Sequence, residues 1–218
     1  MEVTGVASSL KGNVTLYTEI HKITKDQKGL NKRIETKYLN PDGKIFAEMV
    51  SDFAKNPTVP EIKFSDSRFD RTEELIFDEA NSEMIFKMTT GKKIQTKKFK
   101  WSKDMVVGQG FDNFIKFQFE QLKIASVPLS FGVIAEMDFF TFRGYKIQDV
   151  NKDVIQIGIE LSSFFLRMFT TELVLDYDVK TQQILSYRGL SNILTNDAKS
   201  QDVLIKYSVK SEQDQVSQ

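Results

Sequence analysis

Apolar and polar residues alternate along most of the chain, which is the pattern of β-strands that bury one face. The clearest example is the stretch 14–24, where Tyr17, Glu19 and His21 share one face and aliphatic residues occupy the other. His21 therefore lies on the polar face of this predicted strand. We interpret it as a surface or structural histidine.

Short polar turns follow one another at a spacing of about ten residues, which is typical of an antiparallel meander. The strongest turn is 40–43, because its proline fixes φ and its glycine tolerates positive φ. A twisted sheet of about ten strands curls or closes. We therefore expect a mainly β fold, with 1–218 as a single domain around one antiparallel, highly curved sheet or incomplete barrel. The polar tail 211–218 is expected to fray.

One segment breaks the alternation, the stretch 110–122 with the sequence GFDNFIKFQFEQL. Gly108 and Gly110 end the preceding strand, and Asp112 or Asn113 can cap a helix. The pattern predicts one principal aromatic helix at about 112–122. Because a helix that is apolar almost all round must be buried, we expect it to pack in the concave side of the sheet.

Composition supports a folded core and narrows the function. The 218 residues are 40% hydrophobic and 28% charged, with 18 phenylalanines against one tryptophan. The formal net charge of zero argues against a dedicated nucleic-acid-binding protein, whose affinity would depend on phosphate neutralisation. Cysteine is absent, which excludes disulfides, thiolate nucleophiles and cysteine-based metal sites.

The start of the chain and its apolar runs bear on localisation. No run reaches the roughly 20 residues that span a bilayer. Met1 is followed directly by Glu2 rather than by a leader-like segment. We expect a periplasmic protein in its mature form, without signal peptide; a cytoplasmic protein is the alternative.

Candidate catalytic groups are few. His21 is the only histidine, and no Gly-x-Ser-x-Gly elbow accompanies it. No histidine pair or calcium-loop motif is present, so we expect no metal and no cofactor. Acidic residues are dense within 66–78, and two carboxylates at 5–10 Å are the machinery of glycoside hydrolysis. A carboxylate-dependent hydrolase is therefore the rival to a non-catalytic function.

Two further motifs have simpler explanations. The turn from Gly108 to Gly110 resembles a phosphate-binding loop, but Asn113 replaces the third glycine and we predict no βαβ unit around it. The lysine-rich run 92–103 contains Phe99 and Trp101, a mixture that can bind single-stranded nucleic acid or an anionic membrane. Lysines on both faces favour a solvated or edge strand, where they block edge-to-edge pairing.

The phenylalanines suggest a binding surface. Adjacent Phe139 and Phe140 must point to opposite faces of a strand, so one of them meets a helix, a ligand or a partner. The helix carries more large apolar residues than one buried stripe requires. We predict that the ligand-binding residues are Phe111, Phe114, Phe117, Phe119, Phe140 and Phe142.

The C-terminal third carries a recognisable pattern, LVLDYDVKTQQILSYRGLSNI followed by VLIKYSV. With GFDNF at 110–114 and VPLSF at 127–131, it resembles an uncharacterised family of exported bacterial β-rich proteins over about 108–207. That family is similar in presumed architecture to periplasmic lipoprotein carriers, whose half-barrel is covered by helices and holds acyl chains. The resemblance implies a container for lipid and carries over no catalytic residue.

Shape, surface and resemblance lead to one expectation. The protein binds an apolar or amphipathic, lipid-like molecule or a protein partner in the bacterial cell envelope, without catalysis. Contact with the membrane periphery or with an envelope protein fits this expectation, and nucleic acid does not. A structural interaction domain with a filled core is the third alternative.

Overall fold

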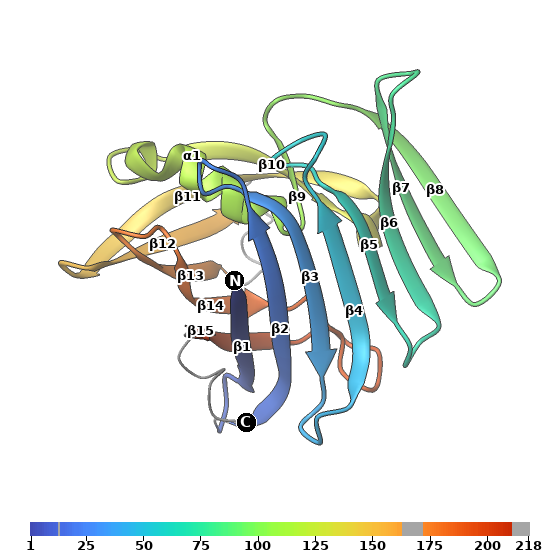
Figure 1. The fold of residues 1–218 in the computed structure, drawn as a ribbon, viewed down its shortest axis with the longest axis horizontal. Helices are drawn as coiled ribbons and strands as arrows, with labels where there is room; N and C mark the ends of the chain where they lie inside the picture. The colour runs from blue at the N-terminus through green and yellow to red at the C-terminus, as the bar shows by residue number, and fades with distance from the viewer. Residues whose placement is uncertain (13, 163–171, 211–218) are drawn as a thin grey trace.

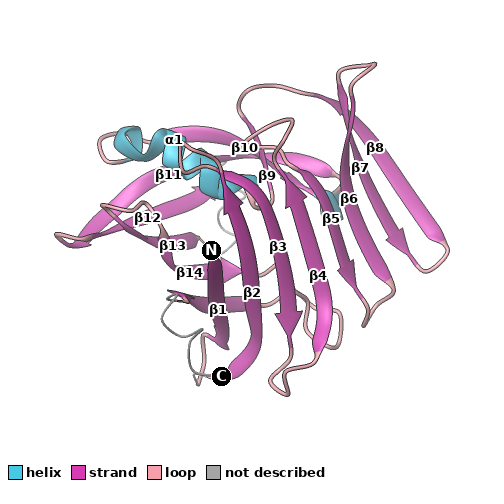
Figure 2. Ribbon diagram, in the orientation of Figure 1, coloured by secondary structure: helices cyan, strands magenta, loops and turns pink. Residues whose placement is uncertain are grey.

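A computed structural model describes residues 1–12, 14–162 and 172–210 and contains one mixed sheet of 15 strands that is not closed into a barrel (Figures 1 and 2). The strands of the first half are β1 (Glu2–Ser9), β2 (Thr15–Lys25), β3 (Asn31–Leu39), β4 (Ile45–Asp52), β5 (Glu61–Asp66), β6 (Arg71–Asp78), β7 (Glu83–Thr90) and β8 (Lys93–Lys100). Those of the second half are β9 (Met105–Val107), β10 (Val127–Val133), β11 (Asp138–Asn151), β12 (Val154–Leu161), β13 (Leu173–Asp178), β14 (Ile184–Leu190) and β15 (Asp202–Val209).

The two helical elements of the described residues both lie in the second half of the chain. The α-helix α1 (Gly110–Leu122) joins β9 to β10, and the 3-10 turn η1 (Ile134–Glu136) joins β10 to β11. The prediction of one principal helix is confirmed, with its start two residues earlier than expected. The tail predicted to fray, 211–218, lies outside the described residues.

The strand order is β8-β7-β6-β5-β4-β3-β2-β1-β15-β14-β13-β12-β11-β10-β9, so β1 joins the two halves through β15. All neighbours are antiparallel except β9 and β10, which are parallel. The expected purely antiparallel sheet is therefore wrong at this edge. The physical reason is the crossover: α1 carries the chain back, so β10 begins beside the start of β9. A βαβ unit thus exists where none was predicted.

Gly108, just before α1, and Gly110, its first residue, both lie where the chain packs closely. A Cβ on Gly110 would lie 2.0 Å from the carbonyl oxygen of Thr58, and one on Gly108 would lie 2.7 Å from Ile62 Cδ1. The loop between β4 and β5 thus covers the start of the helix. Despite the βαβ unit, these contacts explain the glycines without a phosphate: Gly110 lies against the Thr58 backbone, and Gly108 has a φ of +51° and lies against the Ile62 side chain.

Asp112 and Asn113 anchor the helix instead of capping it. The residue before the helix, Gln109, makes no side-chain cap hydrogen bond. Asn31 donates its side-chain amide to Asp112 Oδ2 over 2.7 Å, and its backbone N–H donates to Asn113 Oδ1 over 2.9 Å. Asn113 in turn donates to the carbonyl of Pro57 over 2.9 Å. These bonds tie α1 to the start of β3 and to the β4–β5 loop.

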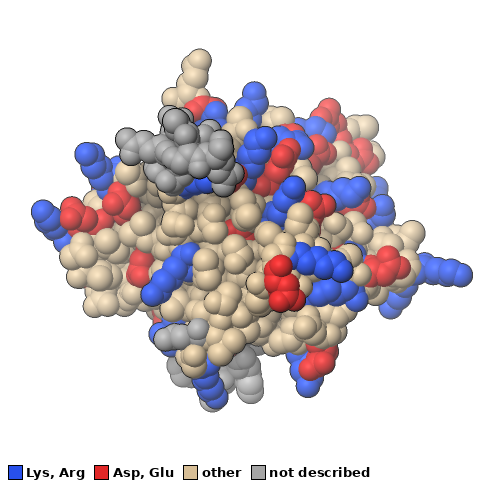
Figure 3. All heavy atoms as spheres, turned by 60° about the horizontal axis from the view of Figure 1, so that its bottom comes forward, with Lys and Arg blue, Asp and Glu red and all other residues tan. Residues whose placement is uncertain are grey.

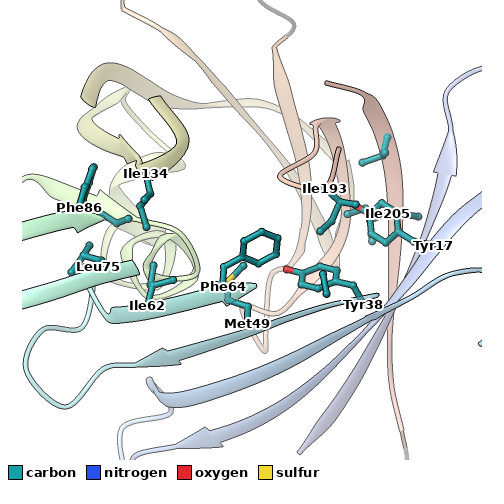
Figure 4. Close-up of a cluster of buried hydrophobic side chains, with 14 of the residues drawn as sticks. Tyr17, Tyr38, Met49, Ile62, Phe64, Leu75, Phe86, Ile134, Ile193 and Ile205 are labelled. Carbon is teal, nitrogen blue, oxygen red and sulfur yellow. The ribbon is translucent and has the colours of Figure 1, made fainter. Parts of the chain in front are cut away.

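Two apolar clusters form the core. The sheet core runs along one face of β1 to β7 and β15, and Figure 4 shows part of it: Tyr17, Tyr38, Met49, Phe64, Leu75, Phe86 and Ile205. The helix core joins α1 to β9–β13 and contains Phe114, Ile115, Phe119, Leu122, Leu129, Ile155, Ile157, Leu175 and Tyr177. The half-buried Tyr187 on β14 packs against both clusters.

Side chains from the two ends of the strand order meet. The ring of Phe139 on β11 stacks on Phe86 at 5.2 Å and meets Phe99 edge-on at 4.9 Å. Lys97 on β8 pairs with Asp138 at 3.2 Å. Phe140 follows Phe139 directly in β11, so its side chain points to the opposite face of the strand, as predicted. The strong curvature expected of the sheet stays a prediction.

Candidate functional site

The six predicted phenylalanines lie in three different settings. Phe114 and Phe119 are buried in the helix core. Phe111 and Phe142 are half-buried against it, and Phe140 is half-buried on β11. Phe117 is 50% exposed and is the helix phenylalanine most open to solvent. The assignment of these six residues to a ligand stays a prediction.

Four of the six gather around Phe131, which the prediction omitted. The ring of Phe111 lies 6.3 Å from that of Phe114 and 6.2 Å from that of Phe131. Phe131 meets Phe142 at 6.2 Å and faces Phe140 directly across β10 and β11. Offset and edge-on pairs at such distances stabilise aromatic packing. The signal for Phe131 was its position at the end of the apolar segment 127–131.

A polar network lies beside the sheet core, on the face of β2 predicted to be polar. Glu19 accepts a hydrogen bond from His21 Nε2 at 3.0 Å, and the other imidazole nitrogen lies 2.8 Å from Thr36 Oγ1. Gln109 donates to Thr36 over 2.9 Å and accepts from Ser51 over 2.8 Å. The histidine side chain is only 12% exposed. The polar face of β2 is therefore the buried face.

The hydrogen bonds of this network are compatible with a neutral His21 imidazole. Because the Gln109 amide donates a hydrogen bond to the Thr36 oxygen, the Thr36 hydroxyl hydrogen is free to donate to His21 Nδ1. Nε2 then carries the imidazole hydrogen and donates to Glu19. Thr36 is 1% exposed and engaged on both sides, so it is not presented to a substrate as a nucleophile would be. The network connects the start of α1 to β2, β3 and β4.

Gly5 makes room for the carboxylate of Glu19. It lies between Glu19 on β2 and Tyr207 on β15, and an added Cβ would come within 2.8 Å of both side chains. Burial raises the pKa of the Tyr207 phenol well above its usual value, and the nearby Glu19 charge and a hydrogen bond to Glu19 raise it further. Glu19 thus has a neutral donor on one side and an imidazole on the other.

Three carboxylates of the acidic segment 66–78 are paired with cationic side chains. Asp66 accepts two hydrogen bonds from the Arg68 guanidinium, at 3.0 and 2.6 Å. Glu73 pairs with Arg71; burial raises the pKa of the Glu73 carboxyl, and the arginine opposes that shift. Glu74 pairs with Lys87 at 2.7 Å. Three of the carboxylates that motivated the hydrolase alternative thus have cationic partners.

A cavity opens where four segments of the chain meet, and we call it the rim pocket. Its volume is about 560 Å³, within the range of 300–1,000 Å³ that is usual for small-molecule sites. It is lined by the start of β2, the β3–β4 turn, the β5–β6 turn and the β14–β15 connection. The lining residues include Leu16, Tyr17, Lys44, Phe46, Arg68, Ile193, Leu194 and Asn196. None of the six predicted phenylalanines lines it.

Arg68 is a fixed wall of the rim pocket. Its guanidinium lies 4.1 Å from the ring centroid of Phe46, and Asp66 neutralises it. A further N–H donates to Asn196 Oδ1 over 3.2 Å, which ties the β5–β6 turn to the β14–β15 connection. Stacking and pairing together hold the guanidinium in place.

Lys44 differs from Arg68, because no acidic group of the described residues pairs with its amine. The rim pocket therefore combines apolar walls from Leu16, Phe46 and Leu194 with one uncompensated positive charge at an exposed position. The β3–β4 turn lies at the bottom of Figure 1, and Figure 3 brings that side forward. Figure 3 shows charges of both signs around a broad uncharged area.

No family model, curated protein or solved structure matches the chain. None of the helices in the described residues is long and apolar enough to cross a membrane. No group of three or more histidine, cysteine or acidic residues is placed to hold a metal ion in the same part of the chain.

Proposed function

We propose that the protein binds a small amphipathic molecule, with an apolar body and an anionic head, in the rim pocket and does not transform it chemically. The observation that carries the proposal is the pocket itself, about 560 Å³, whose lining combines aliphatic and aromatic side chains with polar ones. Such a volume suits a ligand of drug or fatty-acid size. The setting we propose is the bacterial cell envelope, in line with the resemblance to exported proteins.

The polarity of the lining suggests the orientation of the ligand. Leu16, Phe46 and Leu194 offer apolar surface, and burial of a ligand chain there contributes about 25 cal/mol for each Å² removed from water. Lys44 stands free to pair with a carboxylate or phosphate head. Arg68 contributes to the shape of the pocket more than to its charge, because its guanidinium is already paired with the Asp66 carboxylate.

The test is a titration with a fluorescent fatty-acid probe against four variants. We expect Lys44→Glu to weaken probe binding about tenfold, which corresponds to ~1.4 kcal/mol. Leu194→Glu places a charge in the apolar wall and should weaken binding at least as much. Two matched controls lie outside the pocket, Lys37→Glu on β3 and Leu190→Glu, whose leucine is 52% exposed. Both controls should bind like the wild type.

Three results would contradict the proposal. The wild type takes up no probe; the pocket variants bind as well as their controls; or alanine at Phe111, Phe117 and Phe142 abolishes binding while the pocket variants do not. The last result would move the site to the aromatic cluster on the helix. Turnover of the probe into a new product would favour the hydrolase alternative.

A further inference from the structure

The strand β8 is the long open edge of the sheet. It pairs only with β7, and every residue of it except Phe99 is exposed. Figure 1 shows β8 at the margin of the molecule with no strand beyond it. The opposite edge, β9, is three residues long, and the Val107 N–H there already donates to the carbonyl of Thr58 over 3.0 Å. Unpaired backbone groups in register are therefore concentrated on β8.

The register identifies which backbone groups of β8 point outward. Thr90 and Lys93 flank a two-residue turn and pair directly, so they exchange backbone hydrogen bonds. Because such pairs alternate along an antiparallel ladder, Ile94, Thr96 and Lys98 have their N–H and C=O groups turned away from β7. An added strand would bond to these residues.

The side chains of this edge are strongly basic. Of the six lysines in 92–103, Lys97 pairs with Asp138 and Lys98 with Glu83. The remaining four have no ion-pair partner among the described residues: Lys92, Lys93, Lys100 and Lys103. A regular strand with free backbone groups and several unpaired lysines is complementary to an extended acidic segment.

We propose that β8 is a docking edge for an extended, acidic segment of a protein partner, which adds to the sheet as a further strand. Backbone hydrogen bonds would supply the affinity, and carboxylates facing the free lysines would select the partner. The rim pocket takes no part in this contact, so the proposal is independent of the small-molecule function.

Charge and packing disfavour the other occupants. A second copy of the chain would set the lysines of one β8 against those of the other, and facing like charges are destabilising. Single-stranded nucleic acid would stack on aromatic rings. Phe99 is unavailable, because its ring packs against Phe86 at 4.8 Å and Phe139 at 4.9 Å. Only Trp101, 48% exposed, remains.

The experiment is fluorescence anisotropy with a labelled peptide as long as the eight residues of β8, in which glutamate alternates with valine. We expect Thr96→Pro, which removes an outward N–H, to weaken binding about tenfold or more. Thr96→Val keeps that N–H and should bind like the wild type. Lys93→Glu with Lys100→Glu should also weaken binding, whereas Lys11→Glu with Lys37→Glu should not. Raising the salt from about 50 to about 300 mM should weaken the wild-type complex.

A second measurement tests the proposal even if the Thr96→Pro variant does not fold. The same peptide, N-methylated at alternate residues, cannot complete the ladder and should lose binding to the wild type. The proposal fails if the methylated peptide binds equally well, or if a peptide with lysine in place of glutamate does. It also fails if the wild type dimerises through β8, or if a single-stranded oligonucleotide binds more tightly than the peptide and Trp101→Ala abolishes that binding.

Discussion

The helix core and the margin of the sheet core solve the problem of burial in different ways. The helix core is built almost entirely from aliphatic and aromatic side chains. It also contains the Tyr177 hydroxyl, which is buried without a hydrogen-bond partner among the described residues. The sheet core is bordered by carboxylates such as Glu19 and Asp66, each nearly inaccessible and each paired with a basic side chain on the same chain segment.

The two regions differ in what they contribute to the fold: one contributes mainly stability and the other mainly the placement of the helix. Apolar packing in the helix core supplies stabilisation in proportion to area and is indifferent to direction. The network from Glu19 to Ser51 has directional bonds that connect three strands to the start of the helix. We infer that the apolar core stabilises the fold, whereas the polar network sets where α1 begins relative to β2–β4.

The largest effect should come from the helix core. We expect Phe119→Ala to lower the free energy of unfolding by about 3–5 kcal/mol, because the ring is 1% exposed and its removal leaves a cavity. Phe117→Ala, on the same helix but 50% exposed, should cost less than about 1 kcal/mol. Chemical denaturation of both variants measures the contrast. Equal losses would mean that the two faces of the helix are equally covered.

The polar network should respond next. Glu19→Leu leaves the imidazole of His21 and the phenol of Tyr207 without their acceptor, and we expect a loss of about 2–3 kcal/mol. Glu35→Leu is the matched control, because that carboxylate pairs with Arg33 on the exposed side of β3, where solvent screens the pair, and its loss should cost far less stability. A Glu19 variant as stable as its control would show that the network contributes no stability.

Alkaline pH should weaken the fold through the buried phenols. Burial raises the pKa values of Tyr38, Tyr177 and Tyr207 in the folded state well above the usual value of a phenol, about 10. A raised folded pKa gives stability that is complete below the unfolded pKa and is lost as pH rises through the folded one. Thermal melts should therefore fall above about pH 10. Tyr207→Phe should make that fall shallower by up to about 1.4 kcal/mol per pH unit; an unchanged slope would contradict the assignment.

The smallest effect should be at Tyr177. Its hydroxyl is buried in the helix core with no partner in the described part of the chain, so Tyr177→Phe removes an unsatisfied group at no packing cost. We expect stability to stay the same or rise by up to about 1 kcal/mol. A loss above that would mean that the hydroxyl has a bridging partner. Tyr17→Phe is the contrast, because the Tyr17 hydroxyl bonds to Ser191 at 2.8 Å and its loss should destabilise.

The sequence was sufficient for the class of fold, and its limits have physical reasons. Alternation predicted most strands, the aromatic run predicted α1, and the lysines predicted that β8 would be a solvated or edge strand. The parallel pair was missed because β9 has only three residues, too few to show a period. β1 was missed as well, although its alternate residues Val3 and Ala7 are buried.

The sites were harder to predict than the fold. Alternation separates two faces of a strand but does not say which is buried, and on β2 the polar face was the inner one. The partner that explains this, Gln109, lies about 90 residues away from His21 in the chain. The rim pocket brings together Leu16, Phe46, Arg68 and Leu194, whose separations leave no local pattern. The apolar excess singled out Phe111, Phe114 and Phe142, but not Phe131, which joins them in the structure.

The most direct test of the central claim is native mass spectrometry of the purified protein with a matched variant. The account predicts an adduct of one small amphipathic molecule on the wild type, lost from Leu194→Glu and retained by Leu190→Glu. It also predicts that added fatty acid restores the adduct to delipidated wild-type protein. A wild type that carries no adduct and accepts none, or an adduct equally abundant on Leu194→Glu, would contradict ligand binding in the rim pocket.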